Sequence, residues 1–500
     1  MKSHLQPVLI FLMFFIFSCK SENKIDFLYL ENKFSKNAAD SIRLQSLLFI
    51  KDNFDDLTSE KIIFFKDHDF DSIPYFLDTI TSESSLRSII SKNKLSYHSL
   101  FVRDSKILTT EFLEQNINSA VSQWNTFPWS KQIPKDIFLN YLLPYKVLLE
   151  YPSGWRTYFQ KQYQDSINKF VRNGEEDTDK VNASIIAKLY QSINYSENAF
   201  KLTKNPSLNE ILAIGKGECY TLSHLFVYAN RSVGIPSTID IVPLWGSRNG
   251  SHATEVFYRK IETNPNEYTY SFKPSKGSFL NRTAKVFRFS FKKVNVWDDS
   301  IKALIEPQKS YIPEFLKSNH LLDVTDQYAD VSNLKYTFIN RQSDKLAYIC
   351  VFNYGQWMPL FYGRITNSRF AIFNKMSKNM LYQVGVPEGS SYKFVDRAFI
   401  LDSSGKMIYS EPNTNVRIKI KIQKINEGEN SWVKANSKYA LSILNKKNYW
   451  EVVSVKYCET DSVLNFDKIP SNSFYRLKEI GTNHNLERIF LCKNDKIIWY

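Results

Sequence analysis

Two residues with nucleophilic and basic side chains, Cys219 and His252, lie 33 positions apart in this chain. A cysteine thiolate is a strong nucleophile, and a nearby imidazole can take the thiol proton and later return it to a leaving group. Together they are the minimum needed for attack on an amide carbonyl. We therefore expect a Cys–His site with Cys219 as nucleophile and His252 as base.

The residues after Cys219 predict a helix with the sulfur at its N-terminal end. Apolar side chains share one face of this helix, and it is expected to stop at Gly234. The free N–H groups of a helix start favour a thiolate and can hold an oxyanion, so we expect the pKa of the Cys219 thiol to be lowered. Gly215 and Gly217 allow a tight turn into the helix. The apolar face comprises Leu222, Leu225, Phe226, Ala229 and Val233.

Strand-like stretches follow the helix and carry the histidine. His252 opens the stretch 252–260, and the loop before it contains Trp245, which we expect at the wall of a substrate cleft. His224, five positions after the cysteine, is expected to be an ordinary helix residue. Residues 25–175 are mostly helical in pattern, with a Pro-Ser-Gly break at 152–154. A charged loop at 172–180 is a plausible boundary, residues 181–200 continue as helix, and strands dominate after residue 320.

The stretch 215–257 resembles the transglutaminase-like superfamily in its Gly-x-Cys helix, its Arg-x-x-Gly-Ile-Pro turn and the histidine that opens the next strand. The resemblance implies a papain-like fold over about residues 181–295, with Cys219 and His252 in the catalytic roles. Segments 123–159 and 346–365 are similar to a subgroup of bacterial lipoproteins that carry this core. The fold class expected is α+β, with a helical N-terminal region, a papain-like core and C-terminal β-sandwich-like modules.

The chain departs from the family pattern at the third catalytic position. The family has an aspartate on the strand after the histidine strand, but residues 268–278 contain no carboxylate. Asp240 lies on a preceding strand with an unknown direction, and Glu255 is three residues from His252 and so faces the opposite side of a strand. Weaker orienting groups are offered by Tyr268, Tyr270 or Ser271. We list Gly217, Glu218, Trp245 and Asp240 as candidates for the substrate cleft.

The N-terminus resembles a bacterial lipoprotein signal. Lys2 precedes an apolar run at 8–17, which is too short for an ordinary membrane-spanning helix, and Ser18 precedes Cys19. The resemblance implies lipidation of Cys19, and Lys20 after it favours the outer membrane. The alternative is an ordinary secretory signal with an incidental cysteine. We expect a cell-envelope protein that is anchored to the membrane by its N-terminal lipid and faces the periplasm or the cell surface.

The composition is that of a globular protein, with 43% hydrophobic and 23% charged residues. The net charge is +14, but the lysines are scattered and no nucleic-acid-binding motif is present, so no nucleic-acid partner is expected. The cysteines lack metal-ligand spacing, and neither a metal nor another cofactor is expected. Expected segments are a signal peptide at 1–18, a tether and helical region at 19–175, the core at 176–310, and β-modules at 311–410 and 411–500.

Two function classes follow from these features. The first is an enzyme that forms a thioester with an amide substrate and hydrolyses it, as a peptidase or amidase; an amine acceptor would make it a transglutaminase. The second is an inactive relative that binds a peptide or glycan, which the missing aspartate favours. The substrate or ligand would be a peptide, a protein or a glycoconjugate. Trp357, Trp450 and Trp499 are either glycan-binding aromatics or core residues.

Overall fold

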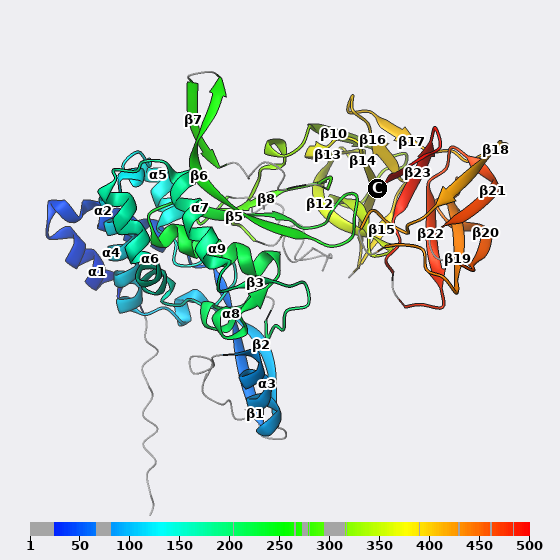
Figure 1. Cartoon of the computed structure of the whole chain (residues 1–500). Coiled ribbons are helices and arrows are strands. Elements are labelled where there is room, and N and C mark those ends of the chain that lie inside the picture. The colour runs from blue at the N-terminus through cyan, green and yellow to red at the C-terminus, as the bar shows by residue number, and fades with distance from the viewer. Residues whose placement is uncertain are drawn as a thin grey trace, which may run out of the picture.

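The structure is a computed structural model, and its described residues are 25–66, 82–203, 205–264, 267–272, 279, 281–294, 316, 318–389, 391–428, 431–460, 463–483 and 485–500. The expected signal peptide and Cys19 lie outside these ranges. Within them, no helix is both long enough and apolar enough to cross a membrane. Figure 1 shows the helical N-terminal part at one end, the core in the middle and the β-rich C-terminal part at the other end.

The N-terminal part is built from helices whose ends are capped by polar side chains. Asp26, Thr109 and Asp177 each accept a hydrogen bond from a backbone N–H in the first turn of their helix. The helices bury apolar faces in two hydrophobic clusters, as expected for amphipathic helices. They are α1 (Phe27–Ser35), α2 (Ser41–Asn53), α4 (Thr110–Thr126), α6 (Trp155–Arg172) and α7 (Thr178–Leu189).

The mostly helical expectation for this part was wrong at three places. Strands β1 (Thr58–Lys66) and β2 (Leu95–Arg103) form an antiparallel pair, with α3 (Glu83–Lys92) between them in sequence. Residues 135–142 form only a short helix, α-helical at 135–137 and π-helical at 138–142, and the chain then runs irregularly to α6 because Pro144 cannot continue a helix. Helix α7 ends at Leu189 instead of reaching residue 200.

The core combines one buried helix with a five-stranded antiparallel sheet. Helix α9 (Cys219–Ser232) packs against β5 (Ser237–Val242) and β6 (His252–Asn264), and α6 and α7 cover it from the other side. It ends before Gly234, whose φ of +81° is readily adopted by glycine, as predicted. The strand order is β7-β6-β5-β8-β9. The remaining strands are β7 (Glu267–Phe272), β8 (Phe287–Phe289) and β9 (Leu321–Asp323).

Helix α8 (Leu208–Ile214) leads the chain to the start of α9. A capping box of Ser207 and Glu210 begins α8, and Gly215 ends it with a left-handed φ of +72°. The following strand β4 (Lys216–Gly217) pairs in parallel with β3 (Asn194–Tyr195). Gly217 is needed for close approach, because a Cβ there would lie 2.3 Å from the Thr221 side chain. The two glycines therefore set the entry into α9.

Two β-rich modules follow the core. The first is an eight-stranded sheet of order β10-β13-β12-β11-β14-β16-β17, with β15 paired to β14. Its strands are β10 (Val331–Thr337), β11 (Leu346–Asn353), β12 (Gln356–Thr366), β13 (Phe370–Ser377), β14 (Met380–Glu388), β15 (Ser391–Phe394), β16 (Phe399–Leu401) and β17 (Met407–Tyr409).

The second module places a two-stranded sheet, β18-β21, beside a five-stranded sheet of order β20-β19-β22-β23-β24. Apolar side chains from both sheets form one cluster between them. Its strands are β18 (Asn413–Ile422), β19 (Ser437–Leu444), β20 (Trp450–Cys458), β21 (Leu464–Ser471), β22 (Tyr475–Ile480), β23 (Ile489–Lys493) and β24 (Lys496–Trp499). The predicted strand-rich C-terminal part is confirmed.

Buried polar contacts join the helical part to the core. Trp129 donates a hydrogen bond to the carbonyl of Val233, just after α9, and Trp155 stacks on Tyr228 of α9 at 4.7 Å. The buried Arg156 guanidinium donates to the carbonyl of Arg231, also on α9. Trp129, Trp155 and Arg156 therefore pack the helical part against the core.

Candidate functional site

Cys219 is the first residue of α9, and its sulfur faces the start of β6. The backbone N–H of Ala253 donates a hydrogen bond to this sulfur. Ala253 directly follows His252, so the contact brings the beginning of the helix and the beginning of the strand together. The side chain of Cys219 is partly exposed, which leaves the sulfur accessible to a substrate.

A carboxylate beside the sulfur opposes its ionisation. The Cys219 thiol donates to Oε2 of Glu218 over 3.3 Å, and Oε1 of Glu218 accepts from Lys201 Nζ at 2.5 Å. Burial, together with the charge of Glu218, raises the pKa of Cys219 to about 11. The predicted lowering of the thiol pKa is therefore wrong, because these two effects outweigh the helix N-terminus.

Glu218 is ionised in this arrangement. Burial alone would raise its pKa, but the Lys201 ammonium and the backbone N–H of Tyr220 hold the pKa of Glu218 below its usual value. The carboxylate also caps α9 through the Tyr220 N–H. Glu218 therefore both caps α9 and helps to keep the Cys219 thiol protonated.

His252 is held between aromatic rings. Trp245 stacks on the imidazole with ring centroids 5.5 Å apart, and Phe279 meets it edge-on at 5.7 Å. Burial, followed by the nearby charge of Arg248, lowers the pKa of His252 from its ordinary value. The imidazole is consequently neutral at pH 7 and able to accept a proton.

No described carboxylate hydrogen-bonds to the His252 ring, on which Glu218 acts only through its charge. The weaker orienting groups also lie elsewhere. Tyr268, Tyr270 and Ser271 of β7 pair with Glu262, Lys260 and Arg259 at the far end of β6. At about 3.3 Å per residue, seven residues separate Arg259 from His252 by roughly 23 Å. The backbone register therefore does not support the alternative that one of these three residues orients His252.

Asp240 does not belong to the cleft, which corrects its place among the candidates. Its side chain is fully buried in the sheet and takes two hydrogen bonds from Arg288 of β8, at 2.8 and 2.7 Å. The Tyr328 hydroxyl donates to the same carboxylate. Both carboxylate oxygens are thus used in a structural ion pair, and Asp240 is not among the residues that line the cleft with Cys219.

Cys219 and His252 line one cleft of about 570 Å³. Glu218, Trp245 and Arg248 lie in the same wall region, as expected for Glu218 and Trp245. Gly217 shapes the backbone beside the cleft but does not line it. The first β-module contributes two further side chains, Tyr354 and Met358. The other lining residues are Tyr195, Glu197, Lys201, Pro243, Leu244, Asn249, Gly250, Ser251 and Asn281.

Comparison with known families matches residues 164–269 to the transglutaminase-like superfamily. The chain carries a transglutaminase-like domain. The matched segment contains both Cys219 and His252 and runs from within α6 into β7. No curated protein matches the chain.

The second histidine of the transglutaminase-like domain, His224, has a structural role. It is fully buried, with Nε2 3.4 Å from the Glu150 carboxylate. Glu150 also accepts from the backbone of Val147 and from the Tyr228 hydroxyl, both at 2.5 Å. Against the cost of burial, these partners hold the pKa of Glu150 well below its usual range. They anchor α9 to the irregular segment before α6.

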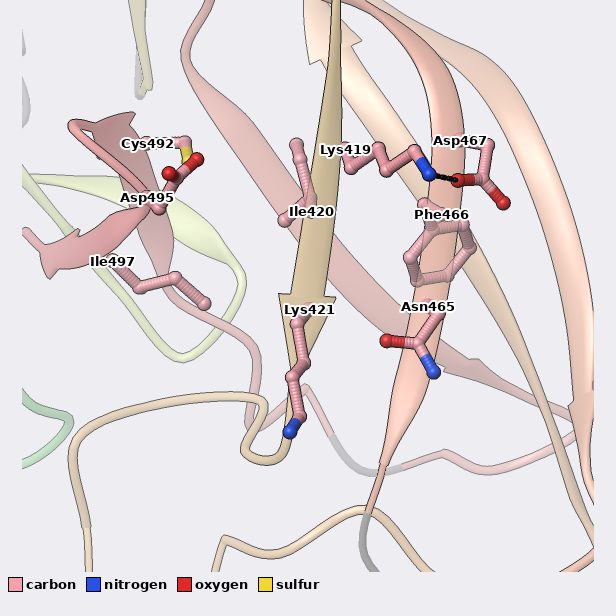
Figure 2. A pocket seen from close by; sticks show the side chains of 9 residues that line it. All are labelled: Lys419, Ile420, Lys421, Asn465, Phe466, Asp467, Cys492, Asp495 and Ile497. Atoms are coloured by element: carbon pink, nitrogen blue, oxygen red, sulfur yellow. Dashed lines mark ion pairs between the residues drawn. The ribbon is translucent and has the colours of Figure 1, made fainter.

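The other described cysteines lack a catalytic setting. Cys219, Cys350, Cys458 and Cys492 are free thiols. Cys350 and Cys458 are buried, and Cys492 borders a hollow of about 490 Å³ in the second β-module, lined by Lys419, Asp467 and Asp495 among others (Figure 2). No histidine lines that hollow. Among the described residues no group of His, Cys, Asp and Glu is arranged to hold a metal ion.

Three of the cleft contacts have no local sequence signal. Lys201 reaches Glu218 from the segment before α8, Phe279 reaches His252 from beyond β7, and Tyr354 comes from a module about a hundred residues further on. Of the glycan-binding candidates, Trp357 is buried in the core, whereas Trp450 and Trp499 are partly buried against Arg476 and Phe490.

Proposed function

We propose that this protein is an extracytoplasmic lipoprotein that cleaves amide bonds through a thioester on Cys219. The observation that carries the proposal is that the Cys219 sulfur contacts the residue next to His252 within one open cleft. A nucleophile and a neutral base at such a point are what acyl transfer requires. The lipoprotein part rests on the N-terminal apolar run and Cys19.

The reaction begins with attack of the Cys219 sulfur on the amide carbonyl carbon while His252 takes the thiol proton. The carbonyl oxygen becomes an oxyanion, for which backbone N–H groups at the start of α9 are the available donors. The carbon–nitrogen bond then breaks, and His252 returns the proton to the leaving amine. Water attacks the resulting thioester, His252 takes a proton from it, and the acid product leaves as the thiol re-forms.

Because the pKa of Cys219 is high, His252 must remove the thiol proton during the attack itself. A resting thiolate–imidazolium pair is disfavoured, so the proton moves as the substrate is attacked. A substrate that contacts Glu218 or Lys201 would also change the charge beside the sulfur. The cleft offers the carboxyl groups of Glu197 and Glu218, the positive charges of Lys201 and Arg248, and the half-exposed rings of Tyr195 and Tyr354. This mixture suits a peptide, protein or glycoconjugate.

A second candidate function is peptide or glycan binding without chemistry. The raised thiol pKa and the absence of a carboxylate on His252 among the described residues favour it. The test is incubation of the intact protein with a mixed peptide digest in ¹⁸O-labelled water. Hydrolysis predicts new amino termini and one ¹⁸O in each new carboxyl group, both lost in Cys219→Ala. Retention of peptides without cleavage would support the binding protein.

A further inference from the structure

The loop between β5 and β6 carries much of the cleft wall and leads into His252. It contains Trp245, Arg248 and Gly250, and it closes on itself through a hydrogen bond from the Trp245 N–H to the Gly250 carbonyl at 3.0 Å. His252 lies only two residues beyond Gly250. The position of the imidazole therefore depends on the backbone of this loop.

The first β-module binds the loop backbone through Asn353, the last residue of β11. Asn353 is fully buried, and its Oδ1 accepts from the Gly250 N–H at 3.0 Å. Its Nδ2 faces the carbonyls of Trp245, Arg248 and Gly250 at 3.4, 3.5 and 3.4 Å. The Asn353 side chain therefore contacts the backbone at both ends of the loop.

The second β-module reaches the same loop through Arg488. This side chain is fully buried, and its Nη2 donates to the Gly246 carbonyl at 2.7 Å. Its Nη1 donates to the carbonyl of Phe352 in the first module, and its Nε donates to the carbonyl of Tyr500 at 2.9 Å. Arg488 therefore joins the core loop, the first module and the end of the second module at one point.

The buried guanidinium of Arg488 is costly to maintain, since burial disfavours its charge.

Asn249 adds two more hydrogen bonds between the modules and the loop. Its Nδ2 donates to the Leu486 carbonyl and its Oδ1 accepts from the Tyr354 N–H, both at 2.9 Å. Several loop polar groups are therefore satisfied by the two modules.

We propose that Asn353 and Arg488 are positioning residues for His252, so that the two β-modules complete the active site of the transglutaminase-like domain. This inference rests on the proposed function. In many Cys–His enzymes a carboxylate orients the imidazole. Here no described carboxylate hydrogen-bonds to the His252 ring. The loop held by the two modules orients the imidazole instead, together with Trp245 and Phe279. Tyr354 and Met358 then form a substrate wall contributed by the first module.

The test measures the position of His252 without requiring turnover. 1,3-Dibromoacetone first alkylates a thiol and then bridges to an imidazole within reach. We compare the intact chain with Asn353→Ala, Arg488→Lys and the control Lys419→Met, which alters an 88% exposed side chain of the second module. The first alkylation at Cys219 should be unchanged in all four proteins, and the folding of each is checked by thermal unfolding.

The inference predicts that bridging from Cys219 to His252 slows about tenfold in Asn353→Ala and Arg488→Lys, because small displacements strongly affect reactions between held groups. The control should bridge at the original rate. Original bridging rates in both folded variants would overturn the inference while leaving the proposed function intact. If one variant does not fold, the other carries the comparison. A failure of the unaltered protein to bridge would overturn both proposals.

Discussion

Replacing Glu218 with glutamine should make Cys219 more reactive. The variant removes the negative charge 3.3 Å from the sulfur and keeps an oxygen that can accept the Tyr220 N–H at the start of α9. With the pKa of Cys219 at about 11, about one thiol in a thousand is ionised at pH 8. A less negative surrounding stabilises the thiolate and lowers that pKa.

The distance sets the size of the effect. Two unit charges 3.3 Å apart interact by about 1.3 kcal/mol at the dielectric constant of water, which corresponds to a fall in pKa of about one. A lower dielectric constant would enlarge the interaction energy, but Lys201 neutralises part of the Glu218 charge. The expected fall in the pKa of Cys219 therefore stays at about one. The thiolate population then rises about tenfold. Since a less basic thiolate is a weaker nucleophile, the rate of alkylation should rise about threefold.

The assay is alkylation by iodoacetamide between pH 7 and 10, followed by mass spectrometry of the peptide that contains Cys219. Lys201→Met is the matched comparison, because it leaves the Glu218 charge without its cation and should slow alkylation at the same pH. An unchanged or slower rate in Glu218→Gln, at an unchanged thermal stability, would refute the assignment of Glu218 as the group that holds the thiol protonated.

Two further predictions concern buried carboxyl groups. Asp240→Asn breaks the buried pair with Arg288 and should lower the free energy of unfolding by about 3–5 kcal/mol in urea titrations. The rate of alkylation of Cys219 in the remaining folded protein should not change. A changed rate would show that Asp240 does act on the site. Burial raises the pKa of Glu210 to about 7, so its contribution to stability is complete below about pH 4.5 and is lost as the pH rises through 7. Relative to Glu210→Gln, the unaltered protein should lose up to about 3 kcal/mol of stability between pH 4.5 and 8, and parallel pH profiles of the two proteins would contradict this.

The sequence was sufficient to predict the elements around the nucleophile. The apolar face after Cys219 and the stop at Gly234 correspond to α9, and the strand predicted from His252 is β6. Local patterns fix such elements because helix and strand periodicities are short-range properties. The β1–β2 pair was missed, since its two strands are separated in sequence by α3 and are stabilised by pairing with each other and by packing against residues elsewhere in the chain.

The electrostatics of the site could not be obtained in the same way. The helix start suggested that the pKa of the Cys219 thiol is lowered. The direction of the pKa shift, however, depends on burial and on the conformation of Glu218, which are tertiary properties. The direction of Asp240 depended on the register of β5 against β8. The contribution of Tyr354 and Arg488 required the placement of whole modules beside the loop, and no local pattern encodes it.

Chemical bridging of the unaltered protein measures whether the Cys219 sulfur and the His252 imidazole meet in one cleft. After treatment with 1,3-dibromoacetone and proteolysis, we expect one cross-linked species that joins the peptide containing Cys219 to the peptide containing His252, and we expect it to disappear in His252→Ala. Alkylation of Cys219 without any bridge to His252, or a bridge to another residue, would show that the two side chains do not meet.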